Sequence, residues 1–140
     1  MITVPAALIA ALIAIESSGN DFAVGDHGKA VGCLQIHPEV VQDVSRRVRP
    51  YTLAQRLDRK ASIEICVFYL NLYANVMRLG HAPSNEDLAR IWHGGPNGYK
   101  DRRTLPYWEK VRVQMLKDLG SPPVIRPADL DGVKLDSPKP

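Results

Sequence analysis

Ten consecutive residues near the start of the chain, 6–15 (AALIAALIAI), carry no polar side chain. A helix formed by them would be apolar on every side, and such a helix belongs inside a domain. The run is shorter than the ~20 residues that span a bilayer, and it lacks the positively charged start of a signal peptide. We therefore predict a buried central helix, with no stable membrane insertion. It is expected to begin near Thr3 as its N-cap, with Pro5 in the first turn.

This apolar run ends in a carboxylate, Glu16, which is followed by the turn sequence Ser-Ser-Gly-Asn at 17–20. A charge beside apolar surroundings costs free energy unless it is paired, neutralised or used. Burial raises the pKa of a carboxyl, and the negative partial charge at a helix C-terminus acts in the same direction. Glu16 is therefore a candidate general acid, because such a group must hold its proton near neutral pH. The alternative is an ordinary glutamate that reaches solvent from the last turn.

Two further helices are marked by periodicity and capping signals. Apolar residues at helical spacing, the last of them Met77, predict one continuous helix over 58–79 that ends at Gly80. Ser84 and Asp87 have the spacing of a capping box at the start of the next helix.

The remaining segments complete a mainly α fold of the α+β class. Helices are expected over 38–48 and 105–120, and the glycine-rich stretch 21–36 predicts a small β-hairpin or irregular β element after the first helix. Residues 1–120 would form one domain. Residues 121–140 hold five of the eleven prolines and are expected to be an extended or disordered tail.

Composition argues against several classes of function. The net charge is +3, and the basic residues lie in scattered runs such as SRRVR and KDRR, which argues against a nucleic-acid binder. The four histidines lack the spacing of a metal site, so we expect neither metal nor cofactor. Cys33 and Cys66 are too few for a disulfide framework and lie in apolar sequence, so buried thiols are favoured over a disulfide.

Four fragments, taken in order, resemble the lytic transglycosylase and goose-type lysozyme group of peptidoglycan-cleaving enzymes. They are Glu16-Ser17, VGDHGKAVGCLQI at 24–36, ARIWHGGPNGY at 89–99 and YWEKV at 107–111. The family's Gly-x-x-Gln-Ile pattern is filled by residues 32–36, and its aromatic-Asn-Gly/Ala-Gly pattern by Trp92-His93-Gly94-Gly95. The resemblance covers roughly residues 4 to 117 and implies a lysozyme-like fold.

The resemblance also implies roles for these residues. Glu16 would be the general acid and base, while Ser17 would hydrogen-bond its carboxyl or the substrate, or else only terminate the helix. The Gln35 amide would bind a sugar N-acetyl group, or else satisfy turn backbone. The saccharide groove would be lined by Trp92, His93, Gly94 and Tyr107.

The pair Trp92-His93 departs from the family's usual Tyr-Asn. In the family that tyrosine hydroxyl reaches the catalytic glutamate, whereas an indole N–H is a donor only. The departure leaves the reaction type open, although a tryptophan ring still suits a sugar face.

Two other carboxylates have ambiguous roles. An inverting hydrolase needs a second carboxylate ~6.5–9.5 Å from the acid to activate water, and Asp26 lies on the loop where goose-type and phage lysozymes place such a group. Asp-His-Gly is also good turn chemistry, and we favour the turn residue over the base. Glu64 on the predicted helix 58–79 is either close to the site or, more simply, solvent-facing.

The leading hypothesis is cleavage of the MurNAc–GlcNAc β-1,4 bond of peptidoglycan glycan strands by a monomeric lytic transglycosylase. Lytic transglycosylases dispense with the second acid, because the substrate's own N-acetyl group assists and the muramyl 6-hydroxyl closes a 1,6-anhydro ring. The alternatives are an inverting lysozyme that uses Asp26, and a non-catalytic peptidoglycan-binding module. Peptidoglycan lies outside the cytoplasmic membrane, and we expect delivery by a phage holin, a virion or a dedicated secretion system, as for an endolysin.

Overall fold

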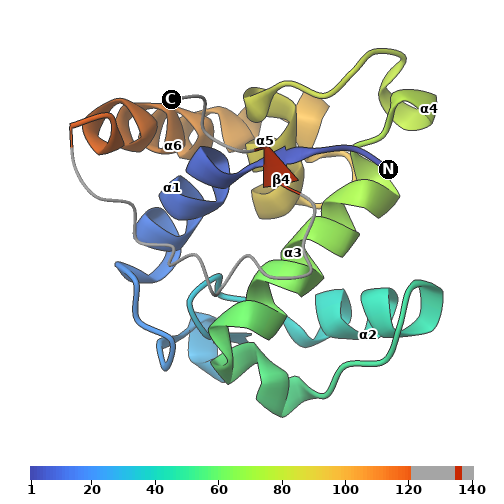
Figure 1. Ribbon diagram of the computed structural model, residues 1–140, viewed down its shortest axis with the longest axis vertical. Coiled ribbons are helices and arrows are strands. Elements are labelled where there is room, and N and C mark those ends of the chain that lie inside the picture. The colour runs from blue at the N-terminus through green and yellow to red at the C-terminus, as the bar shows by residue number, and fades with distance from the viewer. Residues whose placement is uncertain (121–134, 137–140) are drawn as a thin grey trace.

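The first helix supplies much of the buried core, and Figure 1 shows it in blue next to the orange helix at the other end of the described chain. A computed structural model describes residues 1–120 and 135–136 of the chain. In it α1 (Ala6–Ser17) is fully buried from Leu8 to Ile13, as the apolar run predicts. It packs chiefly against α6 (Leu105–Asp118), whose first turn meets the last turn of α1 through Tyr107 and Glu16.

The start of this helix differs from the prediction. Thr3 is not the N-cap, because Pro5 occupies that position in an extended conformation (φ −62°, ψ 135°). A residue before proline is biased away from helical backbone, so Val4 is extended too. Val4–Pro5 forms strand β1, which pairs in parallel with β4 (Leu135–Asp136).

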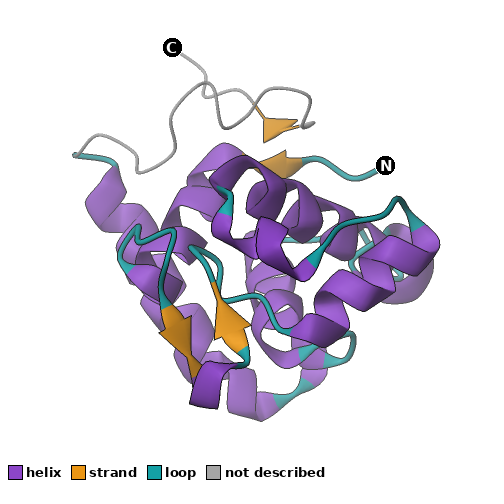
Figure 2. Cartoon of the chain, turned by 90° about the horizontal axis from the view of Figure 1, so that it is seen from below, coloured by secondary structure: helices purple, strands orange, loops and turns teal. Residues whose placement is uncertain are grey.

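The other helices pack against α1 or against one another and give the mainly α fold that the sequence predicts. They are α2 (Pro38–Arg47), α3 (Arg59–Tyr73), α4 (Val76–Leu79) and α5 (Asn85–Gly94), with 3₁₀ turns η1 (Asp26–Gly28), η2 (Leu53–Leu57), η3 (Gly98–Lys100) and η4 (Arg102–Thr104). The predicted hairpin is also present: β2 (Val24–Gly25) runs antiparallel to β3 (Ala30–Val31). Figure 2 shows this hairpin at the edge of the helical body, well apart from the β1–β4 pair.

The predicted continuous helix 58–79 is broken. α3 ends at Tyr73, and Asn75 accepts a hydrogen bond from the Arg78 N–H (3.1 Å) and so caps α4 as a separate short helix. Asparagine side chains compete with the helical backbone in this way. In consequence Met77 is 95% exposed rather than part of the core. Gly80 does end this segment, in the left-handed conformation.

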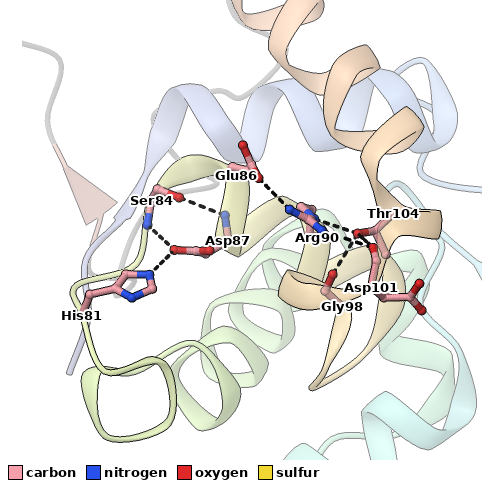
Figure 3. A network of polar contacts seen from close by, with 8 residues as sticks. All are labelled: His81, Ser84, Glu86, Asp87, Arg90, Gly98, Asp101 and Thr104. Atoms are coloured by element: carbon pink, nitrogen blue, oxygen red, sulfur yellow. Dashed lines mark hydrogen bonds and ion pairs between the residues drawn. The ribbon is translucent and has the colours of Figure 1, made fainter.

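A polar network fixes the segment between α5 and α6 (Figure 3). The capping box predicted for Ser84 and Asp87 is confirmed at the start of α5. At the other end, buried Arg90 donates to the Thr104 hydroxyl (2.8 Å) and to the Asp101 carbonyl (3.2 Å). Thr104 in turn donates to the Gly98 carbonyl (2.8 Å). These bonds hold residues 95–104 against α5 and thereby set where α6 begins. The helix ends at Asp118, two residues before the predicted end at residue 120.

Two expectations concern other parts of the chain. Cys33 and Cys66 are both completely buried as thiols, in agreement with their apolar sequence context. Of the predicted tail, residues 121–134 and 137–140 lie outside the described residues, so the division into domain and tail stays a prediction. No helix in the described part of the chain is long and apolar enough to cross a membrane.

Candidate active site

Five of the predicted site residues line one cavity of about 390 Å³. They are Glu16, Asp26, Gln35, Trp92 and His93. These side chains come from the end of α1, the hairpin turn, the loop before α2 and the end of α5, so the fold brings together segments that are up to 77 positions apart in sequence. The cavity is also lined by residues that were not among the predicted site residues, namely Ala30, Ile36, His37, Val40, Tyr69 and Gly95.

Glu16 lines this cavity from the last turn of α1. The helix ends one residue later, at Ser17, because Ser18 adopts the left-handed conformation (φ 53°). Burial raises the pKa of Glu16 from 4.5 to about 7, and a hydrogen bond from Tyr107 opposes part of that rise. A carboxyl with this pKa exists in both protonation states near neutral pH, as a group that first donates and then accepts a proton must.

Tyr107 is the direct partner of Glu16. Its hydroxyl donates to Glu16 Oε2 at 2.8 Å, and its side chain is buried at the start of α6. Burial and the neighbouring Glu16 charge raise the pKa of the Tyr107 hydroxyl well above its usual value, so the hydroxyl stays a donor. Tyr107 was expected to line the groove; instead it contacts the acid and supplies the tyrosine hydroxyl that the Trp92 position lacks.

His93 fixes the Tyr107 ring from one side. The two rings are stacked with centroids 4.1 Å apart and planes 8° from parallel. Partial burial and the charge of Lys110 lower the pKa of His93, which keeps the imidazole neutral at pH 7. A neutral neighbour does not attract the carboxylate form of Glu16, so the raised pKa of that acid is preserved.

Ser17 and Gln35 form different contacts from those that the resemblance implies. The Ser17 hydroxyl donates to the Cys33 carbonyl (2.8 Å), which ties the end of α1 to the turn that carries Gln35. Gln35 Nε2 donates to the carbonyls of Ala23 (3.1 Å) and Gly32 (3.0 Å). Both amide protons are therefore used within the protein, and Oε1 is the atom with which Gln35 can meet a ligand in the cavity.

Asp26 lies on the cavity wall and in a turn at the same time. Its backbone is left-handed (φ 48°) within η1, and its carboxylate lies 3.2 Å from Nε2 of His37. Its side chain is 53% exposed. The turn role and a place on the wall of the cavity that Glu16 also lines are thus compatible.

Glu64 and Gly94 are not among the residues that line the cavity. The Glu64 side chain does not face solvent freely, because it is 13% exposed and accepts hydrogen bonds from Arg49 (2.5 Å) and Tyr51 (2.7 Å). Gly94 packs on Thr104, where a Cβ would lie 2.5 Å from the threonine methyl. Its neighbour Gly95 lines the cavity instead.

Tyr69 is the most informative residue that the sequence did not identify. It lies on α3 and lines the cavity, and its ring meets that of Trp92 edge to face with centroids 5.8 Å apart. Helical periodicity marked α3 as a core helix but did not show which of its residues faces a cavity. Within the described residues no cluster of His, Cys, Asp or Glu is arranged to hold a metal ion.

The comparison with protein families agrees with this geometry. The model of the Transglycosylase SLT domain matches residues 1–82, more than half of the chain, whereas no curated protein matches it significantly. The matched segment includes Glu16 and Gln35, while Trp92 and Tyr107 lie beyond it. Cleavage of glycosidic bonds in peptidoglycan is the general activity of such domains. The chain therefore belongs to the SLT family of transglycosylase domains.

Proposed function

We propose that the protein cleaves the MurNAc–GlcNAc β-1,4 bond of peptidoglycan as a lytic transglycosylase, with Glu16 as both general acid and general base. One observation carries the proposal: a carboxyl with a pKa of about 7 lines a cavity and accepts a hydrogen bond from a buried tyrosine. Tyr107 donates to Oε2, so Oε1 carries the proton of the neutral acid.

The reaction needs one proton to leave Glu16 and return. In the first step Oε1–H protonates the glycosidic oxygen while the bond from that oxygen to the MurNAc C1 breaks. The carbonyl oxygen of the substrate's own N-acetyl group bonds to C1 in its place. In the second step the Glu16 carboxylate takes the proton of the muramyl 6-hydroxyl, whose oxygen displaces the N-acetyl oxygen from C1 and closes the 1,6-anhydro ring. No water is consumed.

The walls of the cavity suit a saccharide. Trp92 and Tyr69 present aromatic surface of the kind that packs on the apolar face of a sugar ring, and Gln35 Oε1 and His37 add polar groups. Tyr107 stabilises the carboxylate that forms when Glu16 gives up its proton.

The second candidate is an inverting lysozyme, and it is favoured by the place of Asp26 in the same cavity as Glu16. There Asp26 would activate a water molecule as the base. Replacement of Asp26 by Asn distinguishes the two reactions, because a hydrolase would lose its activity while the transglycosylase would keep it.

The deciding experiment is mass spectrometry of the soluble products after incubation with purified peptidoglycan, with Glu16→Gln as the control. Muropeptides with 1,6-anhydro ends, lighter than hydrolysis products by one water, are the expected result. Products with reducing ends would overturn the transglycosylase in favour of the lysozyme. No product from either protein would favour a non-catalytic peptidoglycan-binding module.

A further inference from the structure

α2, α3 and the loop after α5 each line the cavity, and each continues past it toward the same part of the structure. On α2, Val40 lines the cavity, and Arg47 follows seven positions later on the same face of the helix. On α3, Tyr69 lines the cavity, and Tyr73 lies one turn further, with ring centroids 4.9 Å apart. After α5, cavity-lining Gly95 is followed by Pro96.

These continuations meet around the ring of Tyr73. The guanidinium carbon of Arg47 lies 5.5 Å from the ring centroid, and that of Arg78 lies 5.6 Å from it. Arg78 donates to the carbonyls of Tyr73 (2.7 Å) and Pro96 (2.9 Å), and so joins the end of α3 to the loop after Gly95. We call Arg46, Arg47 and Arg78 the arginine cluster.

The arginine cluster has more positive than negative charge. Asp43 is its one carboxylate in the described part of the chain, and it lies 3.7 Å from Arg46 and 3.9 Å from Arg47, too far for tight hydrogen bonds. Asp43 instead accepts a hydrogen bond from the Tyr73 hydroxyl. Arg78 donates to neutral oxygens.

Arg47 has donors left for a ligand. Its side chain is 49% exposed, and one of its five N–H groups donates to the Tyr73 hydroxyl (2.9 Å). A guanidinium held over an aromatic ring is already oriented, so less rotamer freedom is lost when it binds a planar anion. Carboxylates are the anions that fit such a fork with two parallel hydrogen bonds.

We propose that the arginine cluster binds the carboxylates of the peptide stems that peptidoglycan carries on its MurNAc residues. The proposal rests on the substrate class of the proposed function. A glycan strand in the cavity would extend along the Tyr69–Tyr73 wall, and the stem of a sugar beyond the cleaved bond would reach Arg47. The cluster would thus make the protein prefer stem-bearing glycan to naked glycan.

The test measures affinity rather than turnover, with the full chain carrying Glu16→Gln so that the probe is not cleaved. Three labelled glycan fragments of equal length are the probes: one with intact stems, one with the stem carboxylates amidated, and one stripped of stems. The additional substitution is Arg47→Gln. Arg112→Gln is the matched control, because Arg112 is 46% exposed and belongs to an ion pair on α6 outside the site.

The intact-stem fragment should bind more tightly than the other two, and Arg47→Gln should weaken its binding by about tenfold while changing the other two little. Arg112→Gln should change none of the three. If the Glu16→Gln protein with its arginines intact binds the three probes with equal affinity, the proposal is overturned before any arginine variant is measured. An equal loss for all probes in Arg47→Gln would overturn it too, since a structural role would have that effect.

The outcome separates this proposal from the proposed function. Cleavage of peptidoglycan by the unmodified protein without discrimination among the probes would reject the stem site alone. Discrimination without any cleavage would leave the stem site standing and reject the enzyme.

Discussion

The hydroxyl of Tyr107 donates a hydrogen bond of 2.8 Å to Oε2 of Glu16, a partner 91 positions earlier in the chain. The bond joins the first turn of α6 to the last turn of α1. It lowers the pKa of a carboxyl that burial raises, and the balance lies at about 7. The following predictions concern this pair and the structure that holds it.

Replacement of Tyr107 by Phe should move the alkaline limb of the pH–rate profile to higher pH. The wild-type rate should fall above about pH 7, where Glu16 loses the proton that it must donate. Without the Tyr107 hydroxyl the pKa of Glu16 rises further, and the maximal rate drops by about tenfold because the carboxylate formed in the first step has lost a donor. The measurement is the clearing rate of a peptidoglycan suspension across pH. A shift to lower pH would contradict this account, and Tyr99→Phe, on η3, should leave the profile unchanged.

Replacement of Glu16 by Gln should stabilise the fold at pH 8 and not at pH 4. The folded-state pKa of about 7 lies above the ordinary 4.5, so the folded protein binds the proton more tightly than the unfolded chain does. The wild type therefore loses stability as the pH rises from 4.5 to 7, and a neutral amide does not. We expect a gain of about 3 kcal/mol in the free energy of unfolding at pH 8, measured by urea denaturation. A gain of equal size at both pH values would show that its origin is not the titration of Glu16.

Replacement of Gly32 by Ala should be far more harmful than the same change at Gly28. Both glycines have φ +88°, so the backbone strain of a side chain is common to both. At Gly32 a Cβ would lie 1.8 Å from the Arg56 carbonyl oxygen, whereas at Gly28 it would meet no atom within 4 Å. We expect Gly28→Ala to cost about 1 kcal/mol and Gly32→Ala more than ~3 kcal/mol. Equal shifts of the urea midpoint would refute the close approach.

Replacement of Arg90 by Lys should destabilise the protein although the charge is kept. A lysine has one nitrogen where the arginine fork donates to Thr104, Asp101 and, at 2.6 Å, to Glu86. The loss should be about 2 kcal/mol, read from thermal unfolding. Activity should fall with it, because residues 95–104 lead into α6 and Tyr107. Arg103→Lys, at an exposed arginine of the same segment, should leave the melting temperature unchanged.

Features with local causes could be predicted from the sequence. The buried first helix follows from residues 6–15, the cap of α5 from Ser84 and Asp87, and the end of α4 from Gly80, because each signal lies within a few residues of the feature that it causes. The apolar run that ends in Glu16 drew attention to this residue locally, but the preference for a catalytic role over an ordinary solvent-reaching glutamate rested on the motifs further along the chain.

Features that depend on distant partners could not be predicted. Strand β1 exists because Val4 and Pro5 meet Leu135 and Asp136. Ser17 donates to the Cys33 carbonyl, a group whose position depends on how the hairpin folds back on α1. The contact of Tyr107 with Glu16 depends on the docking of α6, and no sequence feature near residue 107 indicates that contact.

The long sequence separation between Glu16 and Tyr107 also determines the order in which their two helices are made during synthesis. A ribosome completes α1 long before α6, and contacts of such long sequence separation form late in folding. Because Tyr107 lies on α6, its hydrogen bond to Glu16 cannot form until α6 has been made and has docked. The environment that gives Glu16 a pKa of about 7 is therefore complete only when α6, the last helix of the described residues, is in place.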